Sequence, residues 1–154
     1  LLKVFRMPLL PVIPILGYGK CLYHLIHVDD LTDAMIHAAM HPAALSEPFL
    51  IGNSESIPLA EILSIIAAEY RRPCRTVRLP VTPFFILGDI CEAVFRPLGI
   101  EPPIYRRRVA FYTKDRSFDT RKMREVLRFT PRLSNREGIV QTARWYVENG
   151  WVKP

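Results

Sequence analysis

The sequence predicts an α/β protein in which a few parallel strands are followed by a mostly helical lobe. Short apolar runs alternate with an amphipathic segment between residues 12 and 52, which is typical of a βαβ unit. From residue 53 onward, helical periodicity and capping signals predominate. With 154 residues, of which 49% are hydrophobic, the chain can form one domain with its own core.

The predicted elements begin with the end of a helix over residues 1–7. Residues 12–16 are apolar and lie between prolines, so we expect an edge strand or an extended segment. Residues 17–20 contain two glycines and predict a turn. The apolar stretch over 21–28 then predicts the first strand of the βαβ unit.

A helix over residues 31–40 follows, and Asp30 and Asp33 stand at its expected N-cap and capping-box positions. Its predicted apolar face consists of Leu31, Ala34, Met35, Ala38 and Ala39. Residues 49–52 suit a buried parallel strand. We therefore expect the strands near Leu25 and Leu50 to be parallel neighbours joined by a right-handed crossover.

The second half is predicted to consist mainly of helices. They cover residues 56–72, 84–95, 104–112, 120–127 (capped by Asp119) and 135–149 (with a capping box of Ser134 and Glu137), and a short strand covers 76–79. The apolar helix over 84–95 is too short and too charged to span a membrane. We expect this helix to be buried or at an internal interface rather than lying on a membrane.

Composition limits the classes of partner. The net charge is +6, but no zinc-finger spacing and no alternation of aromatic and basic residues is visible, so we expect no nucleic-acid partner. Cys21, Cys74 and Cys91 are far apart, which indicates a reducing, cytoplasmic environment and no metal site. We expect no membrane partner, although a basic membrane-surface module is an open alternative.

Three groups of motifs, in order, resemble the extended short-chain dehydrogenase/reductase family of NAD(P)-dependent epimerases, dehydratases and hydroxysteroid-dehydrogenase-like enzymes. Residues 27–30 and 49–52 resemble its "His/Tyr-Val-x-Asp" and "Tyr-Asn-Ile-Gly" elements, and residues 118–131 and 137–146 resemble its closing segments. The resemblance implies the C-terminal portion of a Rossmann-type enzyme. Residues 21–52 would belong to the Rossmann sheet, 53–154 to the helical lobe, and the N-terminal cofactor-binding half would be absent.

The family's catalytic signals are not found in this sequence. No glycine-rich turn opens a helix, and none of the six tyrosines is followed four residues later by a lysine. The resemblance therefore implies NAD or NADP in a full-length parent, but no catalytic, cofactor-binding or metal-binding residue in this chain. Whether the chain itself is an enzyme is left open, as is a standalone binding or structural module derived from the family.

The family pattern also implies substrate-binding residues, namely Tyr23, His24, Arg106, Arg108 and Arg116. Tyr23 stands where nucleotide-sugar epimerases carry an arginine that grips a phosphate, and Arg106 and Arg108 lie near a second such position. We therefore expect a small-molecule substrate, either a sugar derivative without a full nucleotide diphosphate or a bulky, partly apolar alcohol or ketone. A homodimer of the parent is a further open alternative.

Overall fold

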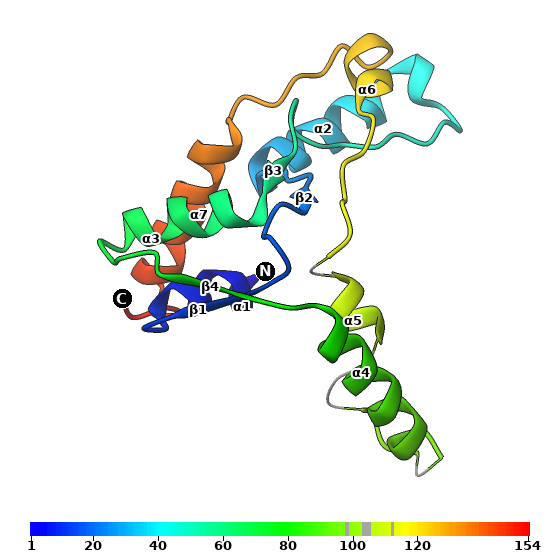
Figure 1. Cartoon of the computed structure of the whole chain (residues 1–154). Helices are drawn as coiled ribbons and strands as arrows, with labels where there is room; N and C mark the ends of the chain where they lie inside the picture. The colour runs from blue at the N-terminus through cyan, green and yellow to red at the C-terminus, as the bar shows by residue number, and fades with distance from the viewer. Residues whose placement is uncertain (98, 103–105, 112) are drawn as a thin grey trace.

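The computed structural model describes residues 1–97, 99–102, 106–111 and 113–154, without the side chains of residues 108 and 111. It has the predicted α/β class (Figure 1). The elements are α1 (Leu2–Arg6), β1 (Ile13–Leu16), β2 (Leu22–Tyr23), α2 (Val28–Met40), β3 (Ile57–Pro58), α3 (Leu59–Glu69), β4 (Thr76–Leu79), α4 (Thr82–Phe95), α5 (Arg106–Phe111), α6 (Arg121–Glu125) and α7 (Asn135–Glu148). Part of the helix predicted over 104–112 lies outside the described residues.

The strands form two short pairs among the described residues. β1 and β4 are parallel, with Ile13 opposite Thr76 and Leu16 opposite Leu79, whereas β2 and β3 are antiparallel. The predicted parallel pairing of the strands near Leu25 and Leu50 is wrong, since residues 49–52 form no strand. This segment is tied to Leu25 by one backbone hydrogen bond of 2.8 Å, from Asn53 N–H to the Leu25 carbonyl. A pair of β-strands needs a repeated series of such backbone hydrogen bonds, and this single bond does not make one.

The main core lies between α3, α7 and α1. Ile62, Ile65 and Ile66 of α3 pack with Ile139 and Ala143 of α7, and all of these side chains are buried. The predicted capping box of α7 is confirmed: the Ser134 hydroxyl accepts from Glu137 N–H, and the Glu137 carboxylate accepts from Ser134 N–H. The apolar residues that α3 and α7 turn toward each other therefore form the main core.

The start of α2 differs from the prediction. His27, not Asp30, is the N-cap residue, and its ring accepts from Asp29 N–H. Asp30 lies one turn inside the helix and is 1% exposed. Its two carboxylate oxygens accept from the backbone N–H groups of Arg132 and Leu133, at 3.0 and 3.1 Å. Asp30 thus holds the loop before α7 against α2 instead of capping the helix.

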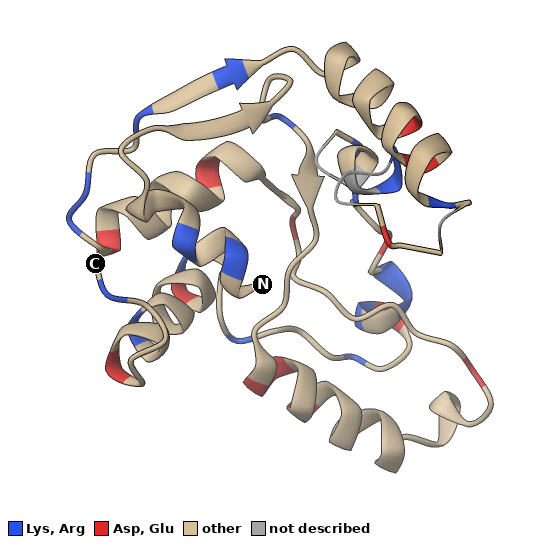
Figure 2. Cartoon of the chain, turned by 90° about the horizontal axis from the view of Figure 1, so that it is seen from below, with Lys and Arg blue, Asp and Glu red and all other residues tan. Residues whose placement is uncertain are grey.

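The predicted apolar face of α2 is largely uncovered. Ala34 is buried, but Leu31 and Met35 are 36% and 65% exposed. Figure 2 shows the acidic residues gathered at the N-terminal end of this helix, with uncharged residues along the rest of it. The apolar pattern therefore predicted the helix correctly but not what covers it.

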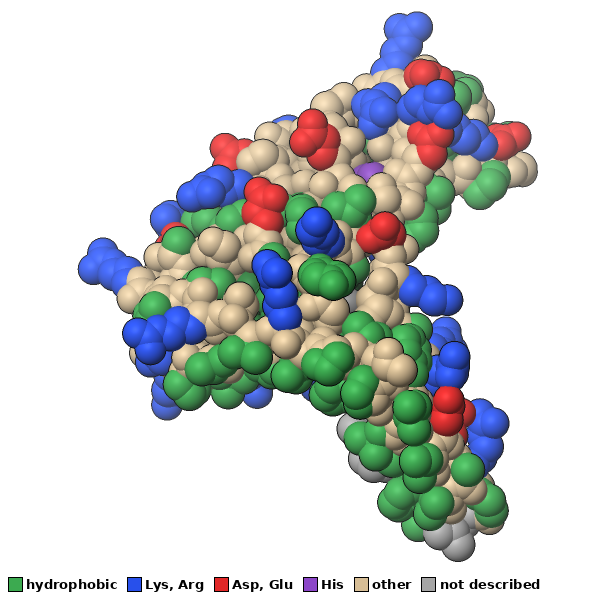
Figure 3. Space-filling view, in the orientation of Figure 1, with side chains coloured by type: hydrophobic (Ala, Val, Ile, Leu, Met, Phe, Trp, Pro, Cys, Tyr) green, Lys and Arg blue, Asp and Glu red, His purple; other side chains and the backbone are tan. Residues whose placement is uncertain are grey.

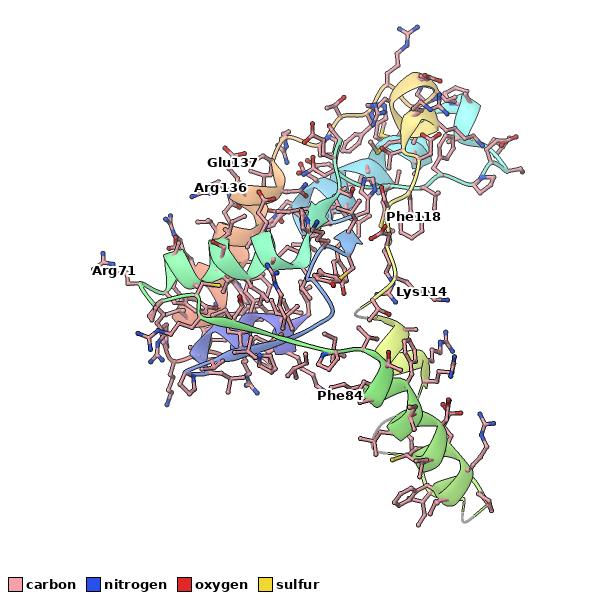
Figure 4. The ribbon with its side chains drawn as sticks, viewed as in Figure 1. Arg71, Phe84, Lys114, Phe118, Arg136 and Glu137 are labelled. Carbon is pink, nitrogen blue, oxygen red and sulfur yellow. The ribbon has the colours of Figure 1, made fainter. Side chains whose placement is uncertain are left out.

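Helices α4 and α5 form an arm that projects from the rest of the chain (Figure 1). Phe84 and Lys114 lie near the base of this arm (Figure 4). Arg106 fastens its two helices, because its guanidinium donates to Asp89 at 2.7 Å and its backbone N–H donates to Glu92 at 2.8 Å. Gly88 is the buried residue of α4, so this helix is not buried within the described part of the chain, and its expected place at an interface stays a prediction.

Candidate functional site

Two segments distant in sequence meet at β2. Leu22 N–H donates to the Asp115 carboxylate at 2.9 Å, and Arg116 N–H donates to the Leu22 carbonyl at 2.7 Å. His24 N–H in turn donates to the Arg116 carbonyl at 2.9 Å. These bonds extend the edge of β2 with the segment that follows α5, and they bring three of the predicted substrate residues, Tyr23, His24 and Arg116, together.

The His24 ring is held on both sides. Its Nδ1 accepts from Phe118 N–H at 3.1 Å, so Nε2 carries the proton and donates to the Asn53 carbonyl at 2.6 Å. The Phe118 ring stacks on it with centroids 6.3 Å apart, and Figure 4 shows Phe118 on the segment between α6 and the arm. A Cβ atom added at Gly52 would lie 2.6 Å from the ring. In this structure His24 therefore joins three segments.

Tyr23 lies between two environments. Its ring is 5.9 Å from the Arg116 guanidinium, and it also lines a cavity of about 600 Å³. The apolar walls of the cavity come from α1, residues 25–26, α3 and Ile139 of α7. The polar and charged residues that line it are Lys3, Arg6, His27, Asn53, Ser134, Asn135 and Thr142. A volume of this size with apolar walls and some polar groups is typical of a small-molecule pocket.

The arginines are divided between two places. Arg116 accompanies Tyr23 at β2, whereas Arg106 lies in the arm, with its guanidinium on Asp89 and 5.0 Å above the Phe85 ring. Arg108 belongs to α5, but its side chain lies outside the described residues. The substrate-binding assignment of Tyr23, His24, Arg106, Arg108 and Arg116 stays a prediction.

The resolved shifts in pKa give no acid or base suited to neutral pH. Burial raises the pKa of Tyr70 to about 12, and its hydroxyl is buried without a hydrogen-bond partner among the described residues. Burial also raises the pKa of the Cys21 thiol. The Arg121 guanidinium holds the pKa of Asp119 at about 2, so this carboxylate is ionised in all ordinary buffers. These groups are suited to structural roles.

The described residues do not fit a dinucleotide. Gly17 and Gly19 have φ angles of +69° and +64°, but they form the turn between β1 and β2 and do not open a helix. Cβ atoms added there would lie 3.2 Å from Val81 and 3.1 Å from Ile15, and the positive φ angles favour glycine at both positions because of the turn. A pyrophosphate cradle instead needs glycines at a helix N-terminus.

The described part of the chain contains neither a candidate metal cluster nor a candidate membrane span. No group of three or more His, Cys, Asp or Glu residues there could hold a metal ion. No helix there is both long and apolar enough to cross a membrane.

The sequence analysis missed two residues that organise this region, Asp30 as a tertiary contact and Asn53. The Asn53 side-chain amide donates to the Leu133 carbonyl at 2.8 Å, and the backbone carbonyl of Asn53 accepts from the His24 ring. A polar residue directly after the apolar run 49–52 was the available signal. The sequence could not show that Asp30 makes a tertiary contact, because an acid near the start of a helix is equally expected of a helix cap.

Comparisons in sequence give relatives that are much longer than this chain. No protein-family profile matches it. It is 28% identical over 138 residues to the uncharacterized protein y4nG of Sinorhizobium fredii, covering 89% of this chain and 33% of that protein. It is 28% identical over 123 residues to sterol-4-alpha-carboxylate 3-dehydrogenase erg26, decarboxylating, of Schizosaccharomyces pombe. That match covers 79% of this chain and 34% of the relative. Short-chain dehydrogenase/reductase family 42E member 1 of Danio rerio is 25% identical over 152 residues, and the match covers 89% of this chain and 37% of the relative. The chain spans about a third of the length of the curated relatives it matches.

Comparisons in structure show the same fold. The crystal structure of gox2253 matches with a TM-score of 0.73 at 20% identity, covering 98% of this chain and 44% of that one. The dTDP-glucose 4,6-dehydratase (rfbB) of Bacillus anthracis, in complex with NAD, matches with a TM-score of 0.63 at 16% identity, covering 97% and 39%. The chain therefore has an α/β fold of the Rossmann type found in epimerases and dehydratases. The chain is thus similar in sequence to relatives named as a short-chain dehydrogenase/reductase and as a sterol dehydrogenase, and similar in fold to a dehydratase, in agreement with the resemblance seen in its motifs.

Proposed function

We propose that this chain is the substrate-binding portion of an NAD(P)-dependent epimerase/dehydratase-like or hydroxysteroid-dehydrogenase-like oxidoreductase. The observation that carries the proposal is the structural match that covers 98% of this chain but 44% of gox2253. The dinucleotide and the catalytic Tyr-x-x-x-Lys pair would come from polypeptide other than residues 1–154. On this proposal the chain alone does not catalyse hydride transfer.

The apolar side chains that α2 exposes support this proposal. Val28, Met35, Ile36 and Met40 are 64%, 65%, 56% and 80% exposed. So many large apolar side chains on one helix are normally buried against other elements of a fold. A Rossmann sheet larger than the strand pairs described here would cover them, in agreement with the greater length of the related structures.

The proposed substrate is a bulky, partly apolar alcohol or ketone, or a sugar derivative without a full nucleotide diphosphate. Tyr23 in place of a phosphate-binding arginine supports an uncharged end of the substrate, as does the apolar wall of the cavity that Tyr23 lines. The relative erg26 is named for a sterol carboxylate substrate. A hydroxysteroid is therefore the first substrate to test, and a nucleotide sugar is the contrasting one.

The test has two parts. Calorimetric titration of the isolated chain with NAD and NADP is expected to show no binding, and micromolar affinity would contradict the assignment of the cofactor site to other polypeptide. The protein encoded by the complete reading frame around these residues is expected to oxidise or reduce a hydroxysteroid with added dinucleotide. Turnover of the nucleotide sugar alone would overturn the substrate class, and turnover of neither would count against the oxidoreductase.

The second candidate is a standalone binding module without catalysis, and the cavity of about 600 Å³ formed by the chain's own residues favours it. On this alternative the isolated chain binds a hydroxysteroid by itself. Ile26→Trp, which would fill part of the cavity, should then weaken binding, whereas Leu45→Trp at a side chain 82% exposed elsewhere should not. Ligand binding unaffected by Ile26→Trp would remove this candidate.

A further inference from the structure

Both nitrogen atoms of the His24 ring are used by the chain itself. Nδ1 accepts from the Phe118 N–H group at 3.1 Å, and the Nε2–H group donates to the Asn53 carbonyl at 2.6 Å. Both partners are backbone groups of other segments. The His24 side chain is half-buried, and Figure 3 shows almost no histidine surface on the face of the molecule in view. A direct hydrogen bond from this ring to a substrate would therefore require the ring to release one of the two segments.

Residues 115–118 form one of the segments that His24 holds. In the described structure these four residues belong to no helix, and they pair with β2 through a single parallel bridge between Tyr23 and Arg116. Backbone hydrogen bonds of 2.7 and 2.9 Å flank the bridge, and the bond from Phe118 N–H to the His24 ring follows two residues later. The segment has no regular structure of its own, so its position depends on these contacts with β2.

The same segment carries the Arg116 side chain to Tyr23. The Arg116 guanidinium lies 5.9 Å from the centroid of the Tyr23 ring, a distance within the range of cation–π contacts. Both residues belong to the predicted substrate site. The place of the guanidinium therefore depends on where the backbone of residues 115–118 is fixed.

Gly52 gives independent evidence that the place of the His24 ring matters. A Cβ atom at Gly52 would lie 2.6 Å from Cδ2 and 2.8 Å from Nε2 of the ring. The φ angle of Gly52 is not positive, so the backbone conformation does not require a glycine there. The close approach of the ring does require one. Any larger residue at this position would push His24 away from Asn53 and Phe118.

We propose that His24 is a positioning residue, which fixes residues 115–118 on β2 and thereby sets Arg116 beside Tyr23 in the substrate site. His24 then leaves the set of direct substrate contacts to which the family pattern assigned it, and it acts through Arg116. The substrate part of this inference rests on the proposed function, whereas the positioning part concerns the chain alone.

Amide hydrogen exchange of the full 154-residue chain tests the positioning, and it needs no substrate. His24→Leu removes the acceptor of the Phe118 N–H group, whereas His24→Asn offers a side-chain carbonyl near the place of Nδ1. Exchange at Phe118 and Arg116 should become about tenfold faster in His24→Leu and stay near the unmodified rate in His24→Asn. His41→Leu is the matched control, the same change at another histidine, and it should leave both rates unchanged. The amide of Ile66 in the main core should exchange at one rate in all these proteins.

Two results of this experiment would overturn the proposal. One is unchanged exchange at Phe118 and Arg116 in His24→Leu. The other is an equal acceleration at Ile66, which would mean a general loss of stability. If circular dichroism shows that His24→Leu is misfolded, Gly52→Ala takes its place, because the added Cβ displaces the ring and should give the same local acceleration. Unchanged rates in Gly52→Ala would then overturn the proposal.

Steady-state kinetics tests the substrate part, using the protein encoded by the complete reading frame, a hydroxysteroid and added dinucleotide. His24→Leu is expected to raise KM about tenfold and to change kcat by about twofold or less, since Arg116 supplies uniform binding. Arg116→Leu should raise KM similarly, and the double variant should be no worse than Arg116→Leu alone, because His24 acts through Arg116.

The kinetic outcomes separate the two proposals. A loss in kcat alone for His24→Leu, or additive losses in the double variant, would mean that His24 does not act through Arg116. An unmodified protein that turns over no hydroxysteroid and no nucleotide sugar would remove the proposed function instead. The exchange rates at Phe118 and Arg116 would still decide whether His24 positions the segment.

Discussion

Helices α3 and α4 are both rich in isoleucine and leucine, yet the structure uses them in opposite ways. In α3, six residues are buried, among them Leu63 and Ile66 at 0% exposure. In α4, Gly88 is the buried residue, and Ile90 is 55% exposed. α3 has α7 and α1 as partners, whereas α4 has α5 on one side only. The comparison teaches that an apolar pattern predicts a helix, while the neighbours decide whether its apolar side chains are buried.

The largest expected effect is a direct test of this comparison. Ile66→Ala in α3 should reduce the free energy of unfolding by about 3 to 4 kcal/mol, because a fully buried side chain leaves a cavity. Ile90→Ala in α4 is the same chemical change at an exposed site, and it should change stability by about 0.5 kcal/mol or less. Urea unfolding measures both. Equal losses would mean that the outer face of α4 is buried in solution.

The same contrast between buried and exposed sites applies to two acids of α2. Asp30→Ala should cost about 2 to 3 kcal/mol, because it leaves the N–H groups of Arg132 and Leu133 without their acceptors in a buried position. Asp33 is bonded to the exposed Arg132 side chain, so Asp33→Ala should cost about 0.5 kcal/mol or less. Urea unfolding of both variants measures these two losses in the free energy of unfolding. A loss of about 1 kcal/mol for Asp30→Ala, the amount expected of a helix cap alone, would contradict its role in holding the loop.

Helix capping gives a smaller difference between the two regions. Ser134→Ala should destabilise the chain by about 1 kcal/mol, since the hydroxyl accepts from Glu137 N–H at the start of α7. No side chain caps α4, and Thr82→Ala at its first residue should therefore have little effect. Thermal unfolding should show a lower midpoint for the first variant. An unchanged midpoint for Ser134→Ala would mean that α7 begins equally well without its capping box.

The smallest effect concerns the exposed ion pair at α6. Donation from Arg121 lowers the pKa of Asp119 from 3.8 to about 2, so the pair stabilises the folded state above pH 3.8. That contribution is lost as the pH falls from about 4 toward 2, and it is small because both groups are exposed. Carbon-detected NMR should give the low pKa directly, and Arg121→Gln should bring it back toward 3.8. A low pKa that persists in Arg121→Gln would assign the shift to the backbone N–H of residue 121, which also donates to Asp119, rather than to the guanidinium.

The sequence by itself determined the local structure and the resemblance. Periodicity predicted the helices now seen as α2, α3, α4 and α7, and the pair Ser134 and Glu137 predicted the start of α7, because these signals act within a few residues. The motifs over 27–30, 49–52 and 118–146 predicted a resemblance to the extended short-chain dehydrogenases/reductases, and the named sequence relatives agree with it.

Tertiary structure alone decided which partners these elements find. It paired β1 with β4, left residues 49–52 without a ladder, and turned Asp30 toward Arg132 and Leu133, more than a hundred residues away. It also held His24 between Asn53 and Phe118 and left α4 uncovered on one side. Burial and hydrogen bonding between distant segments depend on the packing of the whole chain. No local pattern of residues encodes them.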